Sequence, residues 1–125
     1  MENINKKVLI VEDDKDFLWI LKQSFSSAGF VVFTAPDGEE GLVVAQKEKP
    51  DLILLDIIMP KLDGIETARK LQEVKNTAPI IFLTNMKDEA HISKAMETVP
   101  DTEYIIKSDL GVNEVIERVK KRLNL

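Results

Sequence analysis

The sequence contains no cysteine, and it has a single histidine, a single tryptophan and a single tyrosine. The lack of cysteine excludes a disulfide framework, a thiolate metal site and a cysteine nucleophile. Carboxylates, hydroxyls, amines and one imidazole are therefore the side chains that are left for chemistry. Any catalytic or metal-binding role has to be built from oxygen and nitrogen donors.

Long hydrophobic runs are also missing. The first apolar run ends at Glu12, which makes it too short and wrongly flanked for a signal peptide or a membrane span. We therefore expect a cytoplasmic protein without membrane insertion. The 17 basic residues are outnumbered by 22 acidic ones, and this net charge of −5 argues against direct binding of nucleic acid. The chain length of 125 residues fits one domain, residues 1–125 with a core of about 7–123, and we expect no effector domain in this chain.

Short apolar runs rich in β-branched residues alternate with longer segments of helical periodicity. This alternation predicts βαβ units, and hence a parallel sheet covered by helices on both faces. Asp37 and Asp63 are each followed three residues later by glutamate, as in a capping box, and Asp14 is interpreted as a further helix N-cap. Right-handed crossovers leave few windings, so we predict a doubly wound α/β fold with strand order 2-1-3-4-5 and five helices. The predicted strands span residues 7–11, 31–34, 52–55, 80–83 and 104–106.

A carboxylate, Asp56, interrupts the apolar run of residues 52–60. Ionised carboxylates are rarely placed inside apolar segments unless a partner pairs with them or uses them. The neighbouring strands also end in polar residues: Glu12 and Asp13 after the first, Thr84 after the fourth and Lys107 after the fifth. Ligands of open parallel sheets bind outside the carboxyl ends of the strands, where the winding reverses. We therefore expect these side chains to converge with Asp56.

Three converging carboxylates create an electrostatic problem, because like charges about 4 Å apart repel by roughly 4 kcal/mol at an effective dielectric constant of about 20. Either one of the acids is protonated, or Lys107 and a bound cation compensate their charge. Hard oxygen donors without cysteine or histidine suit Mg²⁺, with Mn²⁺ as the alternative. A magnesium ion, a lysine and a hydroxyl around one carboxylate match the needs of phosphoryl transfer, in which an aspartate can itself be the nucleophile.

Four motifs, taken in order, resemble the receiver domain of two-component response regulators from about residue 7 to the C-terminus. They are residues 8–14, residues 54–60 with Asp63 and Gly64, residues 82–84 and residues 104–107. The resemblance implies a flavodoxin-like receiver fold and a phosphoryl group taken onto Asp56 from a histidine kinase or a histidine phosphotransfer protein. Such a domain catalyses its own phosphorylation and dephosphorylation without being a turnover enzyme on an external substrate. A downstream protein target, and a monomer or a phosphorylation-dependent dimer, are further expectations.

The resemblance also implies a metal-binding set. Carried over to this sequence, Asp13 and Asp56 bind Mg²⁺ directly and Glu12 acts through water. The backbone carbonyl of Ile58 is a further ligand. These expectations concern one edge of the predicted sheet.

The same resemblance implies a phosphoryl-binding set and a switch. Lys107 pairs with the phosphoryl oxygens, and Thr84 donates its hydroxyl to them. A phosphoryl group with a charge of about −1.5 to −2 then biases a two-state element, in which Tyr104 rotates with Thr84. Plain packing of the Tyr104 ring at the sheet edge is the alternative.

Two positions depart from the usual pattern of the family. Ser108 follows Lys107 where the family usually has proline after a cis bond, so this loop is either strained or rearranged. Asn85 follows Thr84 where the family usually has a very small residue. Asn85 either narrows the access to Asp56 or adds a hydrogen bond to the phosphoryl group.

Ile58 and Met86 flank the expected path of a hydrolytic water, and neither side chain can orient it, which predicts a long-lived aspartyl phosphate. Ile58 also argues against a phosphatase with an aspartate nucleophile, since that class carries a second acid at this position. A flavin carrier of the same winding is opposed by the acidic residues 12–14, which repel a phosphate. The remaining alternative is a receiver-like binding module that no longer turns over phosphate.

Partner contacts are expected at Trp19, Ile92 and Tyr104. In the first predicted helix Phe17, Phe25 and the leucines between them can supply the core face. Trp19 is then either turned outward, as an anchor for a partner helix, or folded flat over its neighbours.

Overall fold

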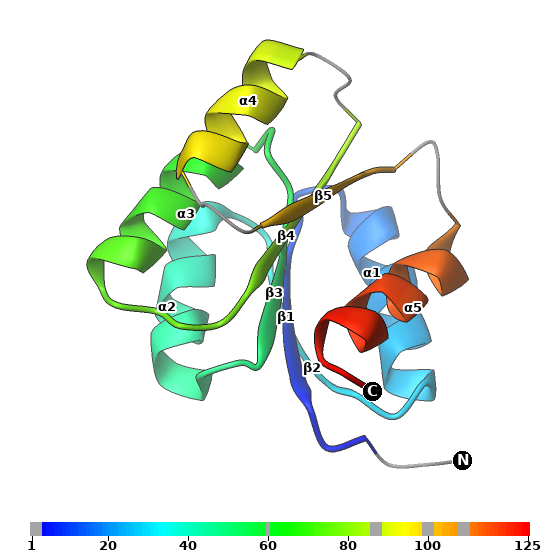
Figure 1. The fold of residues 1–125 in the computed structure, drawn as a ribbon. Coiled ribbons are helices and arrows are strands. Elements are labelled where there is room, and N and C mark those ends of the chain that lie inside the picture. Colours follow the sequence, from blue (N-terminus) through cyan, green and yellow to red (C-terminus); the bar gives the residue numbers. More distant parts are fainter. Residues whose placement is uncertain (1–3, 60, 86–88, 99–101, 108–110) are drawn as a thin grey trace.

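The computed structural model describes residues 4–59, 61–85, 89–98, 102–107 and 111–125. A parallel five-stranded sheet has the order β2-β1-β3-β4-β5, which confirms the predicted winding (Figure 1). None of the helices in these described ranges is long and apolar enough to cross a membrane. The elements are β1 (Lys7–Val11), α1 (Lys15–Ser27), β2 (Val31–Ala35), α2 (Gly38–Glu48), β3 (Leu52–Leu55), α3 (Gly64–Glu73), β4 (Ile80–Thr84), α4 (Glu89–Thr98), β5 (Glu103–Ile106) and α5 (Val112–Arg122).

Helices cover both faces of the sheet, with α2, α3 and α4 on one face and α1 and α5 on the other (Figure 1). Successive residues of the central strands point to opposite faces. Leu9 and Ile53 therefore belong to the core under α2, α3 and α4, whereas Ile10 and Leu54 belong to the core under α1 and α5. Since both faces are covered, the central strands read as continuous apolar runs rather than as alternating patterns.

Three strands extend one residue beyond the prediction, because their hydrogen-bonded register continues into less apolar positions. Ala35 still pairs with Val11, and Thr84 pairs with Ile106. β5 begins at Glu103 rather than Tyr104. The charged side chain of Glu103 is tolerated there because β5 is an edge strand of the sheet.

The three predicted N-caps are confirmed. The carboxylates of Asp14, Asp37 and Asp63 each accept a hydrogen bond from the backbone N–H three residues later, at 3.2, 2.9 and 2.8 Å. Such caps satisfy N–H groups that have no partner inside the helix. They fix the starts of α1, α2 and α3, and the start of α1 lies next to the carboxyl end of β1.

Candidate functional site

The backbone hydrogen bonds of the sheet continue past the strand ends and hold the predicted site residues in place. The N–H of Glu12 donates to β2 at 3.1 Å, and the N–H of Asp56 donates to β1 at 3.0 Å. The N–H of Lys107 donates to the carbonyl oxygen of Thr84 at 2.7 Å. Because all strands run in the same direction, these residues emerge at one edge of the sheet.

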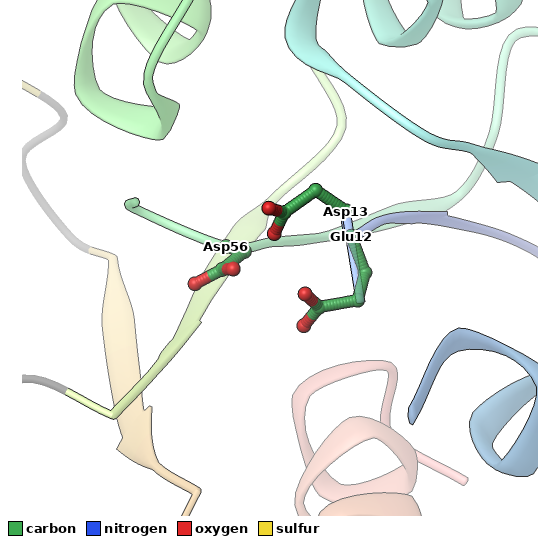
Figure 2. A group of neighbouring side chains, drawn as sticks. All are labelled: Glu12, Asp13 and Asp56. Atoms are coloured by element: carbon green, nitrogen blue, oxygen red, sulfur yellow. The ribbon is translucent and has the colours of Figure 1, made fainter. Parts of the chain in front are cut away.

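Three carboxylates meet at this edge (Figure 2). One oxygen from each of Glu12, Asp13 and Asp56 lies within 4.8 Å of the others. Glu12 is 1% exposed and Asp56 is 5% exposed, whereas Asp13 is exposed to solvent. The cluster therefore has a buried side formed by two acids and an open side formed by the third.

Lys107 supplies positive charge to the buried side. Its Nζ forms an ion pair with Oε1 of Glu12 and lies 3.5 Å from Oδ2 of Asp56. The lysine side chain is only 12% exposed, so its charge is poorly screened by water. The ammonium group is shared between two carboxylates and is closer to that of Glu12.

The hydrogen bonds of Glu12 leave room for a further ligand. Its Oε2 accepts a hydrogen bond from the N–H of Asp14 at 3.1 Å. Its Oε1 is buried and touches Lys107, but no hydrogen bond to it is formed by the described residues. A buried acceptor of this kind, beside two more carboxylates, fits a hard divalent cation and its waters. Glu12, Asp13 and Asp56 are therefore suited to hold Mg²⁺ or Mn²⁺.

The electrostatics of the cluster act most strongly on Asp56. Burial, followed by the charge of Glu12, raises the pKa of Asp56 to about 8, and Asp13 adds to this effect. Lys107 acts in the opposite direction and lowers this pKa. The lysine alone therefore does not keep Asp56 ionised at neutral pH. A bound divalent cation would favour the ionised form, because it places positive charge next to the carboxylate.

These side chains share a cavity of about 330 Å³. Ile58 lies at its exposed side, with 53% of the residue accessible to solvent, and Asn85 is also exposed. Thr84 is fully buried. The cavity thus has an acidic floor and an apolar residue at its rim. Its lining consists of Glu12, Asp13, Asp14, Asp56, Ile58, Thr84, Asn85 and Lys107.

A glycine is required directly beneath this cavity. A Cβ atom on Gly64 would lie 2.0 Å from the carbonyl oxygen of Asp56 and 2.8 Å from Cα of Ile57. The N–H of Gly64 donates to the carbonyl oxygen of Ile57 at 2.7 Å. The start of α3 therefore presses against the backbone of Asp56 and helps to fix its position.

A larger cavity of about 510 Å³ lies at the opposite edge of the sheet, beside the C-terminal ends of α2 and α3. Among the described residues that line it, Asp51 is the sole carboxylate. Oδ2 of Asp51 accepts a hydrogen bond from the N–H of Lys7 at 2.8 Å, so this acid serves the start of β1. The chemistry-bearing residues are gathered at the smaller cavity.

The family of the chain follows from comparison with known proteins. The model of the family described as response regulator receiver domain matches residues 8–120. The chain belongs to this family. The acidic cluster and Lys107 are thus found in a receiver domain.

Curated relatives of this receiver domain are transcriptional regulators. The alkaline phosphatase synthesis transcriptional regulatory protein PhoP of Bacillus subtilis is 41% identical over 117 residues, which cover 94% of this chain and 48% of the relative. The probable transcriptional regulator ycf27 of Guillardia theta is 40% identical and is matched over 95% of this chain and 47% of its own length. The chain spans about half the length of the curated relatives it matches.

Solved structures agree with the fold. A CheY-like receiver domain protein of Methanospirillum hungatei superposes with a TM-score of 0.88 at 28% identity, covering 96% of this chain and 94% of that structure. The CheX–CheY–BeF3–Mg complex of Borrelia burgdorferi contains a chain with a TM-score of 0.84 at 31% identity, covering 94% of this chain and 89% of that one. The flavodoxin-like receiver fold is therefore shared across distant relatives.

Two of the residues predicted for the receiver switch have different surroundings. Thr84 is buried at the end of β4 and lines the acidic cavity. Tyr104 pairs in register with Phe82 on the neighbouring strand. Its ring is half-buried and packs against the core under α2, α3 and α4. Rotation of Tyr104 with Thr84 stays a prediction.

The predicted partner surface is described in part. Trp19 is 63% exposed on α1, which favours the outward orientation over a ring folded flat. The side chain of Ile92, on α4, lies outside the described residues, and so do Met86 and Ser108. The predictions made for these three residues stay predictions, as does the partner contact at Trp19.

Two features of the site were missed at the sequence level. Gly64 appears in a motif, but no spacing rule indicates that its missing Cβ makes room for the carbonyl of Asp56. Phe17 was assigned to the core face of the first helix, and its ring does pack there. The same ring also lies under Nζ of Lys107, at 4.8 Å from the ring centroid. Sequence periodicity carries no signal for a contact between α1 and the end of β5.

Proposed function

We propose that this receiver domain accepts a phosphoryl group on Asp56 from a histidine kinase or a histidine phosphotransfer protein, in a Mg²⁺-dependent reaction. The observation that carries the proposal is the position of Asp56. Its carboxylate is buried, faces a cavity, and lies beside the ammonium group of Lys107 and two more acids. A carboxylate held only for structure has no need of this arrangement.

In the proposed step, one carboxylate oxygen of Asp56 attacks the phosphorus atom of a phosphohistidine. A P–O bond forms while the P–N bond breaks, and the donor imidazole leaves with the electron pair of that bond. The product is an aspartyl phosphate. Attack of water on the phosphorus later releases inorganic phosphate and restores the carboxylate, so the domain returns to its starting state.

The surrounding residues prepare Asp56 for this step. Asp13 and Asp56 would hold Mg²⁺ directly, Glu12 would act through water, and the backbone carbonyl of Ile58 would serve as a further ligand. When bound, the ion supplies the positive charge that keeps Asp56 ionised and neutralises phosphoryl oxygens. The presence of Mg in the CheX–CheY–BeF3 complex, a relative at 31% identity, supports this assignment.

Lys107 and Thr84 bind the phosphoryl group once it is in place. The ammonium of Lys107 forms an ion pair with Glu12 and lies 3.5 Å from Oδ2 of Asp56, the carboxylate that would carry the phosphoryl group. Thr84 lines the same cavity and donates its hydroxyl to another oxygen. Movement of Thr84, followed by Tyr104, biases a two-state element on the β4–β5 side of the domain, which contacts a downstream protein. The domain acts as a monomer or as a phosphorylation-dependent dimer.

The test is phosphorylation of the purified chain by acetyl phosphate, followed by intact-mass measurement. We expect the mass of one added phosphoryl group when Mg²⁺ is present and no addition when EDTA replaces it. Asp56→Asn removes the acceptor and abolishes the addition. Asp16→Asn is the matched control, because Asp16 is an exposed acid of α1 that does not line the cavity.

Transfer from histidine is tested separately, by profiling the chain against a panel of purified phosphorylated kinases and phosphotransfer proteins. We expect one or a few donors to phosphorylate the wild type rapidly and Asp56→Asn not at all. If neither acetyl phosphate nor any donor phosphorylates Asp56, the receiver-like binding module without phosphate turnover takes the place of this proposal.

A further inference from the structure

Lys107 contacts an aromatic ring in addition to its two carboxylates. Its Nζ lies over the ring of Phe17, at 4.8 Å from the ring centroid. Ammonium groups within about 6 Å of a ring centroid are attracted by the negative charge of the ring face. Because the lysine side chain is only 12% exposed, water screens this attraction weakly.

The ring of Phe17 is anchored by its backbone and by the core. The N–H of Phe17 donates to the capping carboxylate of Asp14 at 3.2 Å, which fixes the first turn of α1. The ring itself is half-buried against the core under α1 and α5. Lys107, in contrast, carries its charge on a flexible stem with many rotamers. The ring therefore has a defined position, and its contact with the ammonium limits where the ammonium can lie.

A cation–π contact, unlike an ion pair, leaves the N–H groups of the lysine available for other partners. The ring face attracts the whole ammonium group and takes up no carboxylate oxygen. The ammonium of Lys107 can then keep its ion pair with Glu12 before phosphorylation and donate to a phosphoryl oxygen afterwards. The distance of 3.5 Å from Nζ to Oδ2 of Asp56 is short enough for this change of partner without a large movement.

We propose that Phe17 is a positioning residue for Lys107: its ring keeps the ammonium beside Asp56 while the lysine changes its partner from Glu12 to the phosphoryl group. This inference rests on the function proposed above, since it concerns the same transfer step. Phe17 acts only through Lys107 and is neither a metal ligand nor a contact of the phosphoryl group.

The test is a double-mutant cycle between Phe17 and Lys107, read as the rate of phosphorylation by acetyl phosphate at saturating Mg²⁺. Phe17→Leu keeps an apolar side chain in the core but removes the ring, and we expect it to slow the reaction about 3- to 10-fold. Phe17→Tyr keeps the ring and is expected to stay within about twofold of the wild type. In the Lys107→Met background, Phe17→Leu is expected to change the rate by less than about twofold.

A control separates this effect from a loss of core packing. Phe25 lies on the same helix, is fully buried and packs edge-on against Phe30, with 5.3 Å between ring centroids. Phe25→Leu therefore disturbs the core at least as much as Phe17→Leu but leaves Lys107 alone. We expect it to lower the urea midpoint of unfolding without changing the phosphorylation rate of the folded protein. An equal slowing by Phe17→Leu with and without Lys107 would overturn the proposal.

A second measurement does not depend on phosphorylation. The ring of Phe17 should shift the NMR signals of the Lys107 side-chain CH₂ protons upfield, and Phe17→Leu should remove this shift. Absence of the shift in the wild type would overturn the contact and with it the positioning role. A shift together with no phosphorylation of the wild type would instead reject the proposed function, and the positioning role in transfer with it, while leaving the contact established.

Discussion

Lys107 forms an ion pair with Oε1 of Glu12, while its Nζ lies 3.5 Å from Oδ2 of Asp56. The lysine is thus closer to the acid that flanks the proposed acceptor than to the acceptor itself. This division of charge leaves Asp56 with a raised pKa, because burial and the neighbouring acids outweigh the lysine. The resting site is therefore prepared for additional positive charge, and the stability of the protein should depend on whether that charge is supplied.

The first prediction concerns the pH dependence of stability without divalent cations. Burial and the charge of Glu12 raise the pKa of Asp56 from its ordinary value of 3.8 to about 8, so the folded state binds the proton more tightly than the unfolded state. The free energy of unfolding should therefore fall as the pH rises through this interval, from about 4 to about 8. Asp56→Asn removes this titration and should be more stable than the wild type at pH 8 by roughly 1 to 4 kcal/mol.

Urea unfolding in EDTA at several pH values between about 4 and 8 measures this effect in both proteins. The difference in unfolding free energy between Asp56→Asn and the wild type should grow with pH. Asp16→Asn, an exposed acid of α1, serves as the control and should follow the wild-type curve. Parallel curves for the wild type and Asp56→Asn would show that Asp56 is ionised throughout this range.

The second prediction concerns Mg²⁺. A ligand that binds only the folded state stabilises it by about 2.7 kcal/mol at a concentration 100-fold above its dissociation constant. Mg²⁺ should therefore raise the melting temperature of the wild type in a concentration-dependent way, and more weakly at pH values where it has to displace the proton of Asp56. Asp13→Asn removes one proposed ligand and should abolish most of this increase. Calorimetry of both proteins against Mg²⁺ concentration tests this, and an unchanged increase in Asp13→Asn would place the ion elsewhere.

The third prediction concerns the glycine beneath the site. Gly64→Ala brings a Cβ to within 2.0 Å of the carbonyl oxygen of Asp56, and the backbone has to shift because neither side is a flexible side chain. We expect a loss of about 1–3 kcal/mol in stability and slower phosphorylation of Asp56. Gly111→Ala is the matched control, since its nearest contact would be Oε1 of Glu114 at 3.6 Å. Equal stability and equal rates for the two variants would contradict the close approach.

Much of the fold could be predicted because it depends on patterns within single segments. The apolar runs predicted the strands, and the rule of right-handed crossovers predicted their order. Asp14, Asp37 and Asp63 predicted three helix starts. The grouping of Asp56 with Lys107 followed from topology, since parallel strands deliver their carboxyl ends to one edge. The distribution of charge inside that group did not follow, because it depends on which rotamer each side chain takes.

Contacts between distant segments were the least predictable part of the site. The ring of Phe17 meets Lys107 only when α1 packs beside the end of β5, and periodicity reports the buried face of a helix but not its neighbours. The requirement at Gly64 has the same origin. Its φ/ψ preference is not the reason for the glycine; the reason is the distance to another backbone segment, which no local pattern records.

The fourth prediction concerns the outward-facing Trp19. At 63% exposure the ring contributes little to the core, so Trp19→Ala should leave stability within about 0.5 kcal/mol of the wild type. Trp19 is the proposed anchor for a phosphohistidine donor, so Trp19→Ala should slow transfer from the cognate donor about tenfold or more. The rate with acetyl phosphate should not change, since this small donor needs no docking surface. Val74→Ala, 46% exposed at the end of α3, is the control, and unchanged transfer by Trp19→Ala would remove the anchor role.

The last prediction concerns the lifetime of the aspartyl phosphate. Ile58 lines the cavity two residues after Asp56 and is 53% exposed, so water reaches it but finds no polar group on its side chain. Ile58→Asn adds one neutral hydrogen bond to such a water. A hydrogen bond of this kind contributes about 0.5–1.5 kcal/mol, and the same decrease in the activation free energy makes hydrolysis about 2- to 10-fold faster. Loss of phosphate from the purified phosphoprotein in Mg²⁺ measures this rate. Val43→Asn, at 56% exposure on α2, makes the same chemical change away from the cavity and should have no effect. A wild-type phosphoprotein that decays within seconds would show that the apolar rim does not protect the phosphoryl group.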